Sequence, residues 1–228
     1  MNESIGNFDE FAKNYNEVLS SALGLFGNEN AYYAYRKVEL LSKLVGVNHP
    51  QRVLDFGCGI GSVIQHLFKF FPNADIWGTD PSAESLEIAN QLNPQMHCVT
   101  ETDIPSNYFD YVVISNVLHH IPESARGAQL EQISQCLVAG GKLVIFEHNK
   151  LNPITRRIVD RCEFDEGVEL LSRHSASDLL RSTGNFGDLE SGYFLLVPPI
   201  LKRLRSVEQF FGRVPLGAQF WLTARRLA

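Results

Sequence analysis

A glycine-rich turn after a short apolar run constrains the fold of this chain more than any other segment. Residues 52–56 read Arg-Val-Leu-Asp-Phe, a pattern typical of a buried strand, and glycines follow at positions 57, 59 and 61. From Ser62 to Phe71 apolar residues recur at helical spacing. A strand that turns through glycines into a helix lets a ligand approach the backbone where a Cβ would collide. The segment therefore predicts a pocket for a small molecule or cofactor.

The spacing of these glycines narrows the kind of ligand. A dinucleotide site favours G-x-G-x-x-G, with pyrophosphate held at the helix N-terminus. Here the spacing is G-x-G-x-G, and Asp55 stands two residues before the first glycine. A carboxylate there would repel a pyrophosphate, but it can accept hydrogen bonds from an ammonium group or order the loop. The turn thus favours a zwitterionic or cationic ligand.

Composition sets the broad class of the protein. The chain has 228 residues, 44% of them hydrophobic, and a net charge of −6. One domain with an ample core is expected, without the basic surface that a nucleic-acid partner needs. No apolar run approaches the roughly 18 residues of a membrane span, and the polar N-terminus lacks the apolar core of a signal peptide. The four cysteines show no CxxC spacing, so we expect a reduced, cytoplasmic setting and a monomer or homodimer.

The order of predicted elements indicates an α/β fold. Apolar strand patterns alternate with helical ones, which predicts a doubly wound, mostly parallel sheet covered on both faces. Two helices are expected within residues 8–45, joined at 24–30. Strands are predicted at 52–56, 75–79, 95–99, 109–115, 142–148, 188–197 and 217–225, with the last pair antiparallel. Helices are predicted at 62–71, 82–91, 122–138, 175–183 and 199–211.

We therefore expect a single domain over residues 1–228. It would comprise a helical cap (1–48), a core that binds the cofactor (49–148) and an acceptor-side part (149–228) with the last strands. The connection over 149–174 is long enough to form part of a lid. The basic residues Arg156, Arg157 and Arg161 are expected to form surface ion pairs with the acids between 160 and 166. The amphipathic helix at 199–211 is expected to pack on the sheet rather than on a membrane.

Acidic residues also follow the second and third predicted strands. Asp80 closes the second strand about twenty residues after the glycines, where a ribose-binding carboxylate belongs in nucleotide folds. Asp103 follows the third strand, where a carboxylate could accept an adenine amino group. Each has a structural alternative, since Asp80 could cap the next helix and Asp103 could form a turn before Pro105. Asp55, Asp80 and Asp103 are in register with three successive predicted strands, and together they favour a nucleoside ligand.

Five features of the chain together define a pattern. They are the glycine turn, Asp80, Asp103, the segment 109–122 (Phe-Asp-Tyr-Val-Val-Ile-Ser-Asn-Val-Leu-His-His-Ile-Pro) and Gly140-Gly141 before 142–145. The pattern resembles the class I S-adenosylmethionine-dependent methyltransferases, in the small-molecule branch with a helical N-terminal cap. The resemblance covers residues 8–148. It implies a Rossmann-like, seven-stranded sheet with an antiparallel last strand.

The resemblance also implies a set of cofactor-binding residues. Those around the methionine part of S-adenosyl-L-methionine would be Asp55, Gly57, Cys58, Gly59 and Gly61. Asp80, followed by Pro81, would bind the ribose hydroxyls, and Asp103 the adenine amine with Ile104 beside the ring. Ser115 and Asn116 would lie near the sulfonium. From the N-terminal cap, Tyr15 and Arg36 are the candidates for closing over the cofactor, and Arg36 could pair with its carboxylate.

Two pairs of residues are candidates for catalysis. His119 and His120 follow the fourth predicted strand, and Glu147 and His148 end the fifth. Strands four and five are neighbours in this fold, so the four side chains can converge on an acceptor. We predict His120 or His148 as the base, oriented by Glu147. Packing of the loop is the alternative role for each histidine. No recognisable metal-ligand spacing occurs, and no metal site is predicted.

The sequence thus favours a methyltransferase that modifies an oxygen or nitrogen of a small organic acceptor by in-line displacement. The segment after the fifth strand is similar to a branch associated with saccharides or secondary metabolites. The alternative is a non-catalytic regulatory domain that binds S-adenosylmethionine but has a closed acceptor pocket. An open cavity lined by the histidines would distinguish the two.

Overall fold

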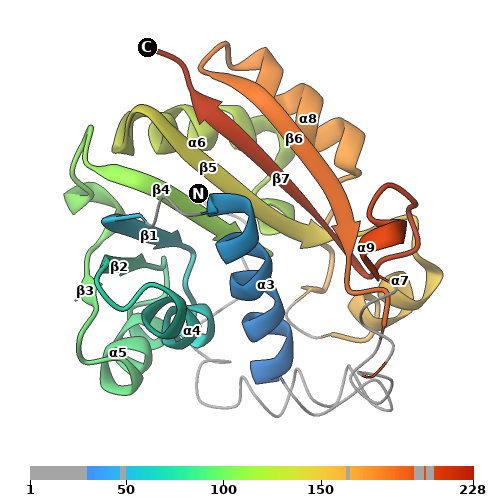
Figure 1. The fold of residues 1–228 in the computed structure, drawn as a ribbon, viewed down its shortest axis with the longest axis horizontal. Helices are drawn as coiled ribbons and strands as arrows, with labels where there is room; N and C mark the ends of the chain where they lie inside the picture. The colour runs from blue at the N-terminus through green and yellow to red at the C-terminus, as the bar shows by residue number, and fades with distance from the viewer. Residues whose placement is uncertain (1–29, 47–49, 163–164, 198–202, 204–207) are drawn as a thin grey trace.

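The alternating elements form one seven-stranded sheet in the computed structural model (Figure 1). The structure describes residues 30–46, 50–162, 165–197, 203 and 208–228. The strand order is β3-β2-β1-β4-β5-β7-β6, and only β7 runs antiparallel to its neighbours β5 and β6. The strands are β1 (Arg52–Phe56), β2 (Asp75–Thr79), β3 (His97–Cys98), β4 (Phe109–Ser115), β5 (Leu137–His148), β6 (Phe186–Phe194) and β7 (Gln219–Arg226). The predicted fold class and the antiparallel last strand are confirmed.

Helices cover both faces of this sheet. Residues of α3, α4 and α5 pack with one face of the strands, and residues of α6 and α8 pack with the other (Figure 1). The helices are α3 (Asn30–Val45), α4 (Ser62–Phe70), α5 (Ala83–Leu92), α6 (Glu123–Cys136), α7 (Pro153–Val159), α8 (Arg173–Ser182) and α9 (Glu208–Phe211). The first predicted helix of the cap lies outside the described residues.

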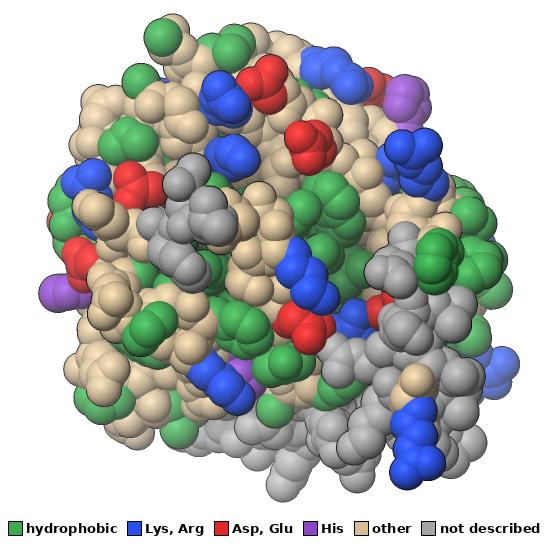
Figure 2. Space-filling model, in the orientation of Figure 1, with side chains coloured by type: hydrophobic (Ala, Val, Ile, Leu, Met, Phe, Trp, Pro, Cys, Tyr) green, Lys and Arg blue, Asp and Glu red, His purple; other side chains and the backbone are tan. Residues whose placement is uncertain are grey.

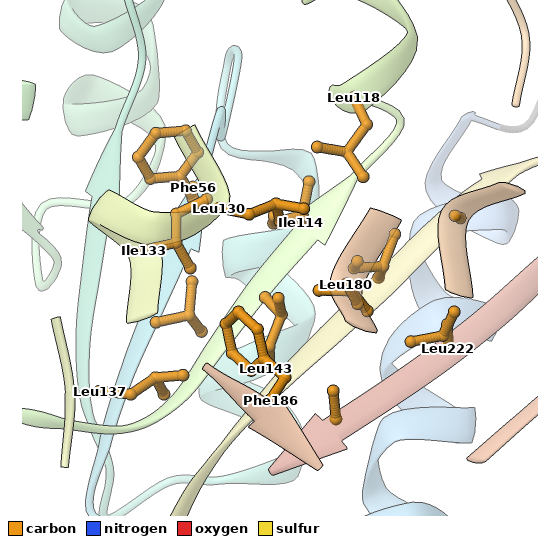
Figure 3. Packing of buried hydrophobic residues seen from close by; sticks show 14 of the residues in the cluster. Phe56, Ile114, Leu118, Leu130, Ile133, Leu137, Leu143, Leu180, Phe186 and Leu222 are labelled. Atoms are coloured by element: carbon orange, nitrogen blue, oxygen red, sulfur yellow. The ribbon is translucent and has the colours of Figure 1, made fainter. Parts of the chain in front are cut away.

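The core explains why the strand segments are continuously apolar. Both faces of the central strands are buried, so Leu54, Val112 and Ile145 point to the α6 side while Val53 and Val113 point to the α3 side. Figure 3 shows the α6 side. Its labelled side chains come from β1, β4, α6, β5, α8, β6 and β7 and from the turn after β4: Phe56, Ile114, Leu118, Leu130, Ile133, Leu137, Leu143, Leu180, Phe186 and Leu222.

The fifth strand begins earlier than the sequence predicts. The structure ends α6 at Cys136 and starts β5 at Leu137, whereas the sequence predicts a helix to 138 and a strand from 142. Phe109 pairs with Leu137 but Tyr111 pairs with Lys142, so the extra residues of β5 form an irregularity. Gly140 takes a φ of 78° there. The paired glycines therefore shape a bulge inside the strand rather than a stop before it.

The region after β5 is built around side-chain contacts. Asn152 caps α7 by accepting hydrogen bonds from the backbone N–H groups of Ile154 and Thr155. Its amide also donates to the Leu216 carbonyl at 2.7 Å, and Asn149 donates to the Gly217 carbonyl at 2.8 Å. These contacts place α7 beside the chain that enters β7, at one end of the sheet (Figure 1). Of the helix predicted at 199–211, the structure describes residue 203 and α9 (Glu208–Phe211), and Phe210 is exposed there.

On the face shown in Figure 2, basic and acidic side chains are scattered among one another and do not form one large basic area. Within the described part of the chain, no helix is both long and apolar enough to cross a membrane.

Candidate active site

A cavity of about 910 Å³ opens where the first five strands end. Open parallel sheets bind ligands at this edge, where the strand order reverses between β1 and β4. One wall comes from α3 and another from Thr155, Ile158, Cys162 and Asp165. The polar and charged side chains on the lining are Tyr33, Lys37, Asp55, Ser62, Asp80, Ser85, Thr100, Glu101, Ser115, Asn116, His120, Gln129, His148, Thr155, Asp165 and Gln219.

Gly57, Cys58, Gly59 and Ile60 of the glycine turn line the cavity, whereas Gly61 does not: a Cβ on Gly61 would collide with Asn93 Nδ2, so this glycine packs against the end of α5. The N–H groups of Gly57 and Cys58 both donate to the Thr79 carbonyl at 2.9 Å, which fixes the turn against the end of β2. A Cβ on Gly57 would lie 2.5 Å from the Val117 side chain, and the φ of Gly57 is 73°. A Cβ on Gly59 would meet no atom within 4 Å. Packing and backbone conformation therefore both favour glycine at position 57, whereas at position 59 the φ of 51° alone favours it.

Asp80 connects this turn to the next helix. One carboxylate oxygen accepts a hydrogen bond from the Gly59 N–H at 2.7 Å, and the other accepts one from the Ser82 N–H at 3.0 Å. Ser82 is itself the N-cap of α5 and accepts from Ser85 N–H. Asp80 and the adjacent Pro81 also line the cavity. The carboxylate thus orders the loop and faces the cavity from the same position.

A buried pair of opposite charges lies beside the turn. Asp55 is 1% exposed, and neither of its carboxylate oxygens has a hydrogen-bond partner. Burial raises its pKa to about 7, although Lys37 acts in the opposite direction. Lys37 on α3 donates to Ser115 Oγ at 2.7 Å, and burial lowers its pKa to about 8 against the attraction of Glu147 and Asp55. An unsatisfied buried carboxylate is costly unless something binds it.

The residues predicted for the rest of the cofactor lie in different places. Cys58, Ser115 and Asn116 line the cavity. Tyr15 lies outside the described residues. Arg36 contacts Glu208, Glu39 and Tyr32 and is not part of the lining, whereas its neighbour Lys37 is.

In the segment after β3, the residues that line the cavity differ from those that the sequence predicts. Asp103 is exposed and accepts a hydrogen bond from Thr100 Oγ1 at 2.5 Å, and Ile104 packs against the core on the α6 side. Thr100 and Glu101 line the cavity instead. Residues 101–103 form a turn of 3₁₀-helix, in which each residue is rotated by about 120° from the last. Glu101 and Asp103 therefore face different directions.

At the other end of the cavity, Glu147 organises the turn after β4. Its Oε1 accepts hydrogen bonds from the Val117 and Leu118 N–H groups at 3.1 and 2.8 Å. Its Oε2 lies 2.6 Å from His119 Nδ1. Both side chains are fully buried, with exposures of 1% and 0%. Glu147 therefore orients His119. The sequence predicts instead that it orients His120 or His148.

Three imidazoles gather at this end. The ring centroids of His119 and His120 are 4.2 Å apart, and those of His119 and His148 are 5.2 Å apart. Burial alone would lower the pKa of His119, but Glu147 and Asp165 outweigh it and raise the pKa to about 9. Burial and the neighbouring His119 lower the pKa of both His120 and His148 to about 4. His120 and His148 line the cavity, and His119 lies behind them.

Asp165 is a site residue that the sequence did not identify. It was expected to join a surface ion pair with the arginines of 156–161, but its Oδ1 lies 3.4 Å from Nε2 of both His119 and His120. Its side chain is 10% exposed. Forty-six residues separate Asp165 from His119, so no local motif joins them. With Thr155, Ile158 and Cys162, it shows that the insertion after β5 forms a wall of the cavity.

The chain is similar to known methyltransferases. Residues 28–187 match the model of a family described as a methyltransferase domain. A Bacillus cereus relative described as an uncharacterized methyltransferase is 25% identical over 197 residues, which are 85% of this chain and 83% of the relative.

Solved structures share the fold. A S-adenosylmethionine-dependent methyltransferase from Archaeoglobus fulgidus superposes with a TM-score of 0.62 at 16% identity, covering 83% of this chain and 92% of that one. Phosphoethanolamine N-methyltransferase 2 of Haemonchus contortus, solved with S-adenosyl-L-methionine, gives 0.64 at 16% identity. This chain aligns over its whole length with that protein but spans 62% of it.

The role of Glu147 can be tested by its removal. Glu147→Ala leaves two buried N–H groups and a buried imidazole without their acceptor, and we expect a loss of about 3–5 kcal/mol in the free energy of unfolding. Glu190→Ala, on an exposed position of β6, should change it by less than about 0.5 kcal/mol. Urea denaturation measures both. Equal stability of the two variants would contradict the assigned role.

Proposed function

This chain belongs to the class I S-adenosylmethionine-dependent methyltransferases, and we propose that it methylates an oxygen or nitrogen of a small organic acceptor of saccharide or secondary-metabolite type. One observation carries the proposal: a single cavity runs from the glycine turn to the histidines after β4 and β5. A cofactor at the turn leaves the histidine end for a second molecule. The regulatory-domain alternative requires that this end be closed.

The residues at the turn fit the family's cofactor. S-adenosylmethionine carries an ammonium group and a carboxylate at its amino-acid end. Asp55 offers a buried carboxylate without a hydrogen-bond partner, and Lys37 of α3 offers a buried ammonium on the same lining. Gln219 adds a buried side-chain oxygen, likewise without a partner, on the same lining. We propose that Asp55 binds the cofactor's ammonium group and that Lys37 binds its carboxylate.

The nucleoside end is assigned on the same lining. Asp80 faces the cavity beside the turn and is proposed to accept hydrogen bonds from the ribose hydroxyls, as the sequence predicts. For the adenine amine, the geometry favours Glu101 over Asp103, because only Glu101 lines the cavity. Burial and the nearby Asp80 raise the pKa of Glu101, so a hydrogen-bond donor on the ligand would compensate for its desolvation.

The bound cofactor supplies a methyl group on a positively charged sulfur, ready for in-line displacement. The protein's part is to place the acceptor atom in line with it, exclude water and accept a proton. His148 and His120 both face the cavity at this end, and either can accept the proton of a hydroxyl group. Glu147 acts one step further away, since it holds His119 and the turn on which His120 stands.

Size and polarity support a small acceptor. A volume of about 910 Å³ is near the top of the roughly 300–1,000 Å³ typical of small-molecule sites. The lining includes Gln129, Thr155, His120 and His148, which can donate and accept hydrogen bonds with hydroxyl or amine groups. The net charge of −6 disfavours a nucleic-acid substrate.

Two lysines on the same helix test the cofactor assignment. Lys37→Met removes a buried charged donor, so S-adenosylmethionine should bind about 10- to 100-fold more weakly, which corresponds to about 1.5–3 kcal/mol. Lys43→Met, at an exposed position of α3, should leave the dissociation constant unchanged. Isothermal titration calorimetry gives both values. Equal affinities for the two variants would refute the role of Lys37.

The pH dependence of cofactor binding tests Asp55. Its pKa is raised to about 7, so the carboxylate is charged above pH 7 and becomes protonated below it. Attraction for the ligand's ammonium group is lost on protonation. Affinity should therefore fall as the pH drops from 7.5 to 5.5, by up to tenfold for each pH unit below the pKa. Asp55→Asn should bind weakly at all pH values and lack this acid limb. A limb that persists in the variant would assign it to another group.

Turnover with a panel of acceptors tests the reaction itself. Sugars, phenols and small amines are supplied, and S-adenosylhomocysteine is measured. With an accepted substrate, His148→Ala should lower kcat by about 10²–10⁴ if the imidazole takes the proton, while cofactor affinity is retained. His174→Ala, on the exposed start of α8, is the matched control. Full turnover by His148→Ala would exclude this histidine as the base, and a protein that binds cofactor but methylates no acceptor would favour the regulatory domain.

A further inference from the structure

We infer that His119, His120 and Asp165 form a site for a divalent transition-metal ion of the zinc type at the acceptor end of the cavity. One nitrogen from each imidazole and one carboxylate oxygen lie within 4.8 Å of one another. In the part of the chain that the structure describes, this is the one group of three His, Cys, Asp or Glu residues with such an arrangement.

The distances suit ligands of one ion better than hydrogen bonds. Asp165 Oδ1 lies 3.4 Å from His119 Nε2 and 3.4 Å from His120 Nε2. Hydrogen bonds of this kind are commonly about 2.7–3.2 Å long. Two ligands that bind zinc at about 2.0–2.1 Å in a tetrahedron are separated by about 3.3–3.4 Å. Asp165 Oδ1 is equally far from the two imidazole nitrogens, and both distances match the separation of two ligands on one zinc ion.

The surroundings of His119 also match a ligand imidazole. A metal-binding histidine usually donates its other ring N–H to a carboxylate, which fixes the tautomer and the ring orientation. His119 Nδ1 lies 2.6 Å from Glu147 Oε2. Glu147 is itself held by two backbone N–H groups. His119 Nε2 is therefore directed at Asp165 by a rigid, buried support.

The chemistry of the ligand set indicates the class of ion. Two imidazoles and a carboxylate favour zinc and other first-row divalent ions over magnesium or calcium, which prefer oxygen ligands. Three protein ligands leave a coordination position open, as in catalytic rather than structural zinc sites. His120 and Asp165 line the cavity, so that position faces the acceptor.

This placement bears on the reaction, and that part of the inference rests on the proposed function. An ion here would polarise a hydroxyl oxygen of the acceptor and favour loss of its proton. A nitrogen that binds the ion cannot also accept a proton. His120 would then be a metal ligand, and His148 would be the base.

Zinc binding tests the site directly. The purified full-length protein, stripped with a chelator, is titrated with Zn²⁺ against a chromogenic competitor, and Co²⁺ is used as a spectroscopic probe. We expect one ion per chain and a visible Co²⁺ spectrum typical of a four-coordinate site. His120→Ala and Asp165→Asn should each weaken zinc binding at least tenfold. Glu147→Gln keeps all three ligands and should weaken it by about 10- to 100-fold.

His174→Ala is the matched control, because His174 and Asp178 form an exposed histidine–carboxylate pair at 3.2 Å on α8. It should bind zinc as the unaltered protein does. Unchanged calorimetric affinity for S-adenosylmethionine shows that each variant is folded. Absence of stoichiometric zinc binding, or equal binding by His120→Ala, would overturn the site while cofactor binding and methyl transfer stand. Conversely, failure to bind the cofactor would refute the proposed function, and the zinc titration would be read independently.

Discussion

The buried carboxylate of Glu147 is the contact on which the histidine end of the cavity depends. It stands at the end of β5, yet it accepts hydrogen bonds from the backbone after β4 and from His119. One side chain thereby fixes the relation between two strand ends, and His120 and His148 take their places from those strands. Among the hydrogen bonds described, Glu147 is the acceptor for the backbone N–H groups of Val117 and Leu118. The shape of the turn after β4 therefore depends on this carboxylate.

Charged side chains are buried at both ends of the cavity, and they are paired differently at each end. Near the glycine turn, Asp55 has no hydrogen-bond partner and Lys37 has one, and the proposed zwitterionic ligand would complete their pairing. Near the histidines, Glu147 is fully paired while Asp165 sits at long distances from two imidazoles. Buried charges are costly unless they are matched. The incomplete pairing at each end is thus the physical argument for a ligand there.

In helix α3 the sequence favours Arg36, but the adjacent residue Lys37 is the one that lines the cavity. Arg36 and Lys37 are adjacent, but about 100° of helical rotation separates them. The apolar positions Ala34, Val38 and Leu41 define the buried stripe of α3, and Lys37 falls within that stripe three residues after Ala34. Helical spacing alone could therefore have favoured Lys37. The contact of Arg36 with Glu208 spans 172 residues and had no local signal.

The sequence by itself determined the α/β class, the strand that ends in the glycine turn, and the meeting of His119, His120, Glu147 and His148 at one edge. Those features follow from local periodicity and from the rule that parallel strands end together. Tertiary structure alone decided that β5 begins in a bulge, that Glu101 rather than Asp103 faces the cavity, and that Asp165 reaches the histidines. Each of these depends on how distant segments pack, and packing between segments leaves no periodic mark in the chain.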